Sequence, residues 1–218
     1  MTIRKATFGL SLICTMLVSV VAASSASASS ATAVTAGGTT FTGATAMSAE
    51  TEGFTFYQWT TGGMLVKIEI PAVSASLVGE NSEPGGVMQA EGVGAFTYLG
   101  VSANHGCLVN GEKAEPGKPE VTTHSLKFRT LSTTQLKFEP ALATPIVEFT
   151  LEGCDKPFLN RTWTITGSVI GTPSGAETFF THMTTTGQGT LKANGSITAG
   201  LEGALKLKGE NGNGLEFQ

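Results

Sequence analysis

The chain is short of charge, and aspartate in particular is almost missing. Of its 218 residues, 14% are charged, the 13 basic residues are scattered among 17 acidic ones, and Asp155 is the single aspartate. Scattered basic residues offer no footprint for a phosphate backbone, so we expect no nucleic-acid partner. Because 40% of the residues are apolar, the low charge does not indicate disorder, and the chain has enough apolar surface for a packed core.

The usual signatures of enzymes and cofactor sites are missing as well. The chain has no G-x-S-x-G, H-E-x-x-H or G-x-G-x-x-G motif and no EF-hand loop. Residues 111–119 are similar to a phosphate-binding loop, but the glycines are one residue too far apart and Pro119 replaces the required hydroxyl. The histidines, His105, His124 and His182, do not cluster at ligand spacing. We therefore expect a charged surface loop at 111–119, no cofactor and no metal site.

The N-terminus has the pattern of a secretory signal peptide. Arg4 and Lys5 precede an apolar stretch from residue 6 to 23, and Ala26-Ser27-Ala28 follows as a cleavage site. We expect the signal peptide to cover residues 1–28 and the cleaved chain to be secreted, without stable membrane insertion. The alternative is an uncleaved leader that anchors the chain in the membrane.

Cleavage would leave Cys107 and Cys154 as the remaining cysteines in an oxidising compartment. Two cysteines allow one intrachain pairing, and we predict that these two form a disulfide. The alternatives are two buried free thiols or a pair of metal ligands. A zinc site needs about four ligands, and the sequence offers no further ones at suitable spacing.

Threonine and glycine favour strands and turns over helices. The chain has 32 threonines and 28 glycines, and threonine is stiff at χ1 and fits a pleated surface. Residues 64–70 alternate between apolar and polar side chains until Pro71, as a half-buried strand does. Further strands are predicted over residues 54–59, 95–101, 146–151, 162–166, 178–185, 191–193, 197–201 and 204–208.

The pattern as a whole predicts one β domain. Segments 126–128 and 136–138 both read Leu-Lys-Phe, which predicts a hairpin around residues 131–134. No helical stripe follows the leader. After a flexible lead-in over 29–38, we expect a single all-β domain over 39–218, folded as an antiparallel β-barrel of the meander type, with a β-sandwich as the alternative.

Two features indicate where a ligand could bind. His124 shares a period-two face with Leu126 and Phe128, a position suited to a core histidine with one hydrogen bond or to a buried base that contacts a ligand. Aromatic residues lie on both faces of the strand at 54–59, and Tyr57 and Trp59 either pack inside the protein or form a stacking patch for a sugar or other ligand. His124, Tyr57 and Trp59 are therefore the predicted ligand-binding residues, and no catalytic residue is predicted.

The leader, the Gly106-Cys107 and Gly153-Cys154 pairs and the segment Trp163–Val169 together resemble the uncharacterised secreted β-rich proteins of high-GC Gram-positive bacteria. The likeness covers most of the chain after the leader. It implies a β fold and export, and it carries over no activity.

The sequence therefore predicts a secreted, non-enzymatic β domain that binds an extracellular ligand or serves the cell envelope. The alternative hypothesis is a secreted hydrolase whose site is assembled from distant residues such as His124, His182 and a glutamate.

Overall fold

The computed structural model describes residues 34–36, 38–41, 43–51, 55–82, 89–174, 177–180 and 189–217, and the predicted signal peptide lies outside them. Within these ranges the chain is almost entirely β, with one turn of 3-10 helix at Pro157–Leu159 and no α-helix. The strands are β1 (Val34–Ala36), β2 (Thr39–Thr40), β3 (Thr45–Thr51), β4 (Thr55–Thr61), β5 (Met64–Ile70), β6 (Ala72–Ser82), β7 (Gln89–Leu99), β8 (Ser102–Ala103), β9 (Leu108–Val109), β10 (Glu120–Thr122), β11 (Leu126–Ser132), β12 (Gln135–Pro140), β13 (Val147–Glu152), β14 (Arg161–Thr166), β15 (Val169–Ser174), β16 (Glu177–Phe180), β17 (Lys192–Ala193), β18 (Ile197–Gly209) and β19 (Leu215–Phe217).

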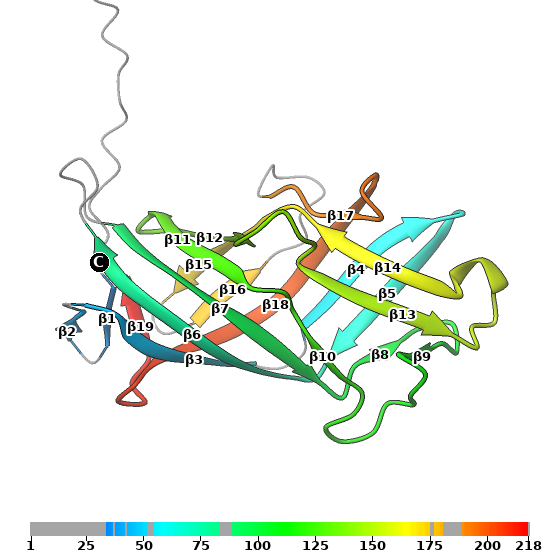
Figure 1. Cartoon of the computed structure of the whole chain (residues 1–218), viewed down its shortest axis with the longest axis horizontal. Coiled ribbons are helices and arrows are strands. Elements are labelled where there is room, and N and C mark those ends of the chain that lie inside the picture. The colour runs from blue at the N-terminus through cyan, green and yellow to red at the C-terminus, as the bar shows by residue number, and fades with distance from the viewer. Residues whose placement is uncertain are drawn as a thin grey trace, which may run out of the picture.

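Eight of these strands close into an antiparallel barrel. Their order around the wall is β3, β6, β7, β11, β12, β15, β16 and β18, and β18 pairs with β3 to complete the ring. Each barrel strand lies beside the next barrel strand along the chain, which is the arrangement of a meander. Figure 1 shows these strands wrapped around one half of the molecule. The predicted fold class is confirmed.

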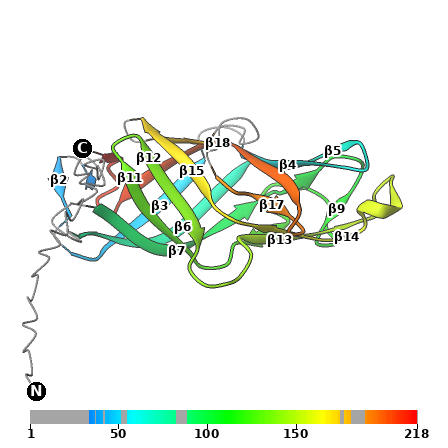
Figure 2. The ribbon, with the colours of Figure 1, turned by 90° about the horizontal axis from the view of Figure 1, so that it is seen from above.

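Strands that leave the barrel form a side lobe at one of its ends. The chain departs as β4–β5, as β8–β9, as β13–β14 and as β17, and it returns to the barrel each time; β10 pairs with the end of the barrel strand β7. The sheet β8-β5-β4 and the sheet β9-β13-β14-β17 both continue into the first half of β18. Figures 1 and 2 show the side lobe extending away from the barrel, with β18 running through both parts.

Aromatic side chains join the two sheets of the side lobe. Trp59 on β4 packs against Trp163 on β14 with ring centroids 5.1 Å apart, and Tyr57 packs against Phe149 on β13 at 5.8 Å. All four side chains are buried. Tilted aromatic pairs at such distances stabilise a fold by about 0.5–1.5 kcal/mol beyond the area that they bury.

The predicted disulfide between Cys107 and Cys154 is confirmed, with the two sulfur atoms 2.03 Å apart. It links the segment before β9 to the segment after β13, at the edge of the side lobe. The bridge therefore ties β9, the edge strand of its sheet, to the neighbouring strand β13.

The interior of the barrel is filled by side chains. Leu77, Phe128, Leu136, Phe138 and Leu207 come from four different barrel strands and are all buried in one apolar core. A void of about 10 Å³ remains among apolar side chains at one end of the barrel, which is room for about one water molecule. A ligand of ordinary size does not fit there.

A small sheet closes the barrel end opposite the side lobe. β1 pairs with β19 on one side and with β2 on the other, so the first and last described strands meet (Figure 1). Asn81 on β6 holds this sheet, because its Oδ1 accepts a hydrogen bond from the Val34 N–H at 3.0 Å and its Nδ2 donates to the Val34 and Phe41 carbonyls at 3.1 Å. The sequence predicts a flexible lead-in over 29–38, whereas the structure places Val34–Ala36 in β1.

Candidate functional site

The two aromatic residues predicted to bind a ligand belong to the core. Tyr57 and Trp59 each keep 2% of their surface exposed. The Tyr57 hydroxyl lies 2.9 Å from the Tyr98 hydroxyl, and burial raises the pKa of Tyr57 to about 12 and that of Tyr98 well above its usual value. The alternative in which these aromatics pack inside the protein therefore describes both residues, and neither ring is available for stacking on a ligand in this structure.

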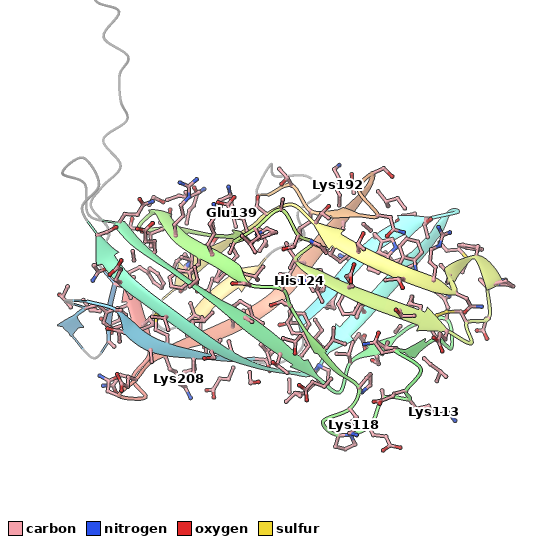
Figure 3. All side chains as sticks on the ribbon, in the orientation of Figure 1. Lys113, Lys118, His124, Glu139, Lys192 and Lys208 are labelled. Atoms are coloured by element: carbon pink, nitrogen blue, oxygen red, sulfur yellow. A yellow bond between two sulfur atoms is a disulfide. The ribbon has the colours of Figure 1, made fainter. Side chains whose placement is uncertain are left out.

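The predicted buried position of His124 is wrong. His124 is exposed and lies in the segment between β10 and β11, where Figure 3 labels it. β11 begins only at Leu126 and Ser125 is exposed as well, so the alternation of the strand does not extend back to the histidine. The His124 N–H donates to the Ile146 carbonyl at 2.9 Å. His182, the other histidine considered for a site, lies outside the described residues.

The outward face of β4 carries Phe56, which is half-buried. The ammonium of Lys67 lies 4.0 Å from the centroid of its ring and 2.8 Å from a Glu69 carboxylate oxygen. The protein's own cation thus occupies one face of this ring, which reduces its value as a platform for a ligand.

The outer wall of the barrel carries a groove, which we take as the candidate site. It measures about 520 Å³ and crosses β6, β7 and β11. Its floor includes Val78 and Val93, which face each other across β6 and β7 and keep 47% and 51% of their surfaces exposed. Charged residues from four strands form its walls, namely Glu80, Glu91, Lys127, Arg129 and Glu139.

Glycines on the inner side of the wall explain why the outer side is hollow. Gly79 and Gly92 are paired across β6 and β7, and Gly92 also pairs with Phe128 on β11. A Cβ on Gly79 would lie 2.7 Å from the Phe128 ring, and a Cβ on Gly92 would lie 2.5 Å from it. The ring therefore occupies the space that two side chains would fill. Because no Cβ separates them from the ring, the strands lie close to it, and the outer surface is depressed over this point.

The walls of the groove carry an unusual pair of like charges. Glu80 and Glu91 lie directly opposite each other on neighbouring strands, an arrangement that destabilises a sheet. Arg129 lies opposite Glu91 on the next strand. Among the described residues, the two carboxylates form no ion pair within 4 Å, and the Arg129 guanidinium forms none either. Departures of this kind from favourable sheet chemistry concentrate at functional sites.

The other cations beside the groove are neutralised within the protein. Lys127 lies 3.2 Å from Glu139, and Lys137 contacts the second oxygen of the same carboxylate. The hydrogen bond from Lys137, together with that from Lys127, holds the pKa of Glu139 below its usual value although partial burial opposes the shift. Figure 3 shows Glu139 on the outer rim of the barrel. Arg129 is thus the cation of the groove that a ligand can reach without displacing an internal partner.

Sequence reasoning did not find this groove, although a signal for it exists. Residues 78–80 read Val-Gly-Glu and residues 91–93 read Glu-Gly-Val. In an antiparallel pair these mirrored segments place valine opposite valine, glycine opposite glycine and glutamate opposite glutamate, as the register of β6 and β7 shows.

Comparisons with known proteins identify no relative. No protein-family model, no curated protein and no solved structure matches the chain. In the part of the chain that the structure describes, no helix has the length and apolar character needed to cross a membrane. The same residues contain no cluster of three or more His, Cys, Asp or Glu side chains that could hold a metal ion.

Proposed function

We propose that this protein is a secreted, non-enzymatic β domain that binds an extracellular ligand or a component of the cell envelope, and that the outer groove of the barrel is its binding site. The leader pattern at residues 1–28 supports export. The interior of the barrel is filled, and Tyr57 and Trp59 are buried. We therefore place the binding surface on the outside of the barrel wall.

The observation that carries the proposal is the composition of the groove. The Ser82 hydroxyl donates to a Glu91 carboxylate oxygen at 3.3 Å, but Glu80, Glu91 and Arg129 have no ion-pair partner among the described residues. An apolar floor beside such charges suits the binding of a ligand, because contact removes Val78 and Val93 from water and supplies counter-charges to the walls. A purely structural wall would gain stability from opposite charges at positions 80 and 91.

Co-sedimentation with insoluble envelope material from a Gram-positive bacterium tests the proposal. Val93→Asp places a charge on the floor of the groove, and Leu65→Asp makes the same change at a strand residue of the side lobe that is 49% exposed. The unmodified chain and Leu65→Asp are expected to sediment with the envelope, and Val93→Asp is expected to stay in the supernatant. Equal sedimentation of both variants, or none by the unmodified chain, contradicts the proposal.

The hypothesis of a secreted hydrolase stays a prediction, because no contact among the described residues supports it. Among the described residues, the His105 Nε2 lies 2.8 Å from the Leu65 carbonyl oxygen, and no hydrogen bond joins a histidine side chain to a carboxylate. A loss of measured hydrolytic activity in His124→Ala, with unchanged stability, would restore it.

A further inference from the structure

We infer that the groove binds an extended peptide segment that carries an ammonium group and a carboxylate group about 7 Å apart. This inference rests on the proposed function and names the class of ligand. It follows from the positions of three charged side chains, Glu80, Glu91 and Arg129, on three consecutive strands of the wall.

The two glutamates form the end of the groove that takes the ammonium group. Glu80 and Glu91 are direct cross-strand neighbours, and no described cation lies within 4 Å of either carboxylate. An ammonium group has three N–H donors and no acceptor, so it can donate to both carboxylates at once and relieve their repulsion. A neutral sugar hydroxyl supplies a donor but no charge, and it leaves the repulsion in place.

Arg129 forms the end that takes the carboxylate. A guanidinium presents parallel N–H donors that match the two oxygens of a carboxylate, and charge-assisted pairs of this kind are strong and directional. Lys127, the other cation in the groove wall, is already held by Glu139. Arg129 lacks an ion-pair partner among the described residues and Lys127 has one, so Arg129 is the cation that is free to bind the carboxylate.

The spacing of the strands sets the length of the ligand. An ammonium group held by both Glu80 on β6 and Glu91 on β7 lies about one and a half strand spacings from Arg129 on β11, which amounts to about 7 Å. An extended chain advances about 3.3 Å per residue, so about two residues span the distance. Val78 and Val93 lie in the neighbouring row of the register, beside the line from the two glutamates to Arg129. Small aliphatic side chains that point to that side of the segment would lie over them.

Calorimetric titration with a matched pair of peptides tests the inference. The first peptide is acetyl-Lys-Ala-Ala with a free carboxylate, and the second is the same peptide with a C-terminal amide. Amidation and the Arg129→Gln variant are each expected to weaken binding about tenfold. Because both changes remove the same contact, their combination should weaken it no further. Glu80→Gln/Glu91→Gln should weaken both peptides alike, and Lys192→Gln, which removes a side-lobe cation, should have no effect.

Three results separate failure of this inference from failure of the proposed function. If both peptides bind the unmodified chain equally, or Arg129→Gln weakens them equally, the assignment of the carboxylate to Arg129 is overturned. If glycan strands without peptide bind and Val93→Asp abolishes that binding, the groove is a binding site but the ligand class is wrong. If neither the peptides nor any envelope material binds, both proposals fail.

Discussion

At the scale of single residues, two tryptophans that pack against each other differ in one hydrogen bond. Trp163 and Trp59 are both buried, and the Trp163 Nε1 donates to the Leu159 carbonyl at 3.1 Å, whereas the Trp59 Nε1 has no partner in the described structure. Both replacements by Phe exchange the indole for a smaller phenyl ring. At position 163 the change also removes a hydrogen bond, whereas at position 59 it also removes an unpaired N–H donor.

Trp163→Phe is therefore expected to lower the free energy of unfolding by about 1 kcal/mol more than Trp59→Phe. Urea denaturation of the two variants, followed by circular dichroism, measures the difference. Equal losses would show that the Trp59 N–H gains as much from its surroundings as the Trp163 N–H gains from Leu159.

The buried pair of Tyr57 and Tyr98 predicts a loss of stability in alkali. Burial raises the pKa of Tyr57 from 10.0 to about 12 and raises that of Tyr98 as well. As the pH rises from 10 towards 12, the unfolded chain releases these phenol protons while the folded protein retains them. The contribution to stability is therefore complete below pH 10 and declines above it.

The variant Tyr57→Phe/Tyr98→Phe removes both titrating groups and keeps nearly the same volume. Its stability is expected to fall less between pH 9 and pH 12 than that of the unmodified chain, as measured by urea denaturation at each pH. Parallel pH profiles for the two proteins would contradict the assignment.

At the scale of the elements, glycine on β6 and β7 lets the wall of the barrel approach Phe128. A Cβ at position 92 would lie 2.3 Å from the Val78 carbonyl oxygen, which belongs to the backbone and cannot rotate away. Gly92→Ala is therefore expected to lower stability by about 1–3 kcal/mol and to change the groove. Gly43→Ala is the control, because a Cβ there meets nothing within 4 Å. Equal denaturation midpoints for the two variants would show that the wall has room to move.

Strands with strict alternation could be predicted from the sequence, and strands defined by their partners could not. The predicted range 64–70 is β5, and the predicted hairpin pairs Phe128 with Phe138 in β11 and β12. β6 lacks bulky alternating residues that would mark it as a strand. It is a strand because its backbone pairs with β7 along its whole length, and the sequence of β6 alone does not indicate that partner. The ranges 197–201 and 204–208, predicted as two strands, are one strand, β18, in which Gly203 has a φ of +141°.

The same distinction explains which parts of the candidate site were missed. Period-two alternation correctly puts Tyr57 and Trp59 on the same face of a strand. It does not indicate whether another sheet covers that face. It fails for His124 because the alternation holds only within a strand, and β11 starts two residues later. The groove depends on the register between β6 and β7, which the mirrored segments at 78–80 and 91–93 indicate only once the two strands are known to pair.

At the scale of the whole molecule, β18 joins the barrel to the side lobe. Its residues 199–202 pair with β4 in the lobe, and its residues 203–209 pair with β16 and β3 in the barrel. Loss of the lobe would expose the buried face of this strand and remove its ladder with β4 and β17. We therefore expect the two parts to unfold together in one transition.

The disulfide gives a test of this cooperativity, because it lies in the side lobe alone. Cys107 and Cys154 are 47 residues apart in sequence, and closing a loop of that length stabilises a protein by about 4 kcal/mol in the loop-entropy model. The variant Cys107→Ala/Cys154→Ala is expected to show a lower melting temperature in calorimetry, still with a single peak whose calorimetric and van't Hoff enthalpies agree. If the lobe instead melts before the barrel, the trace divides into two peaks and only the first of them shifts in the variant. That result would show that β18 does not couple the two parts, and that the barrel with its groove is stable without the side lobe.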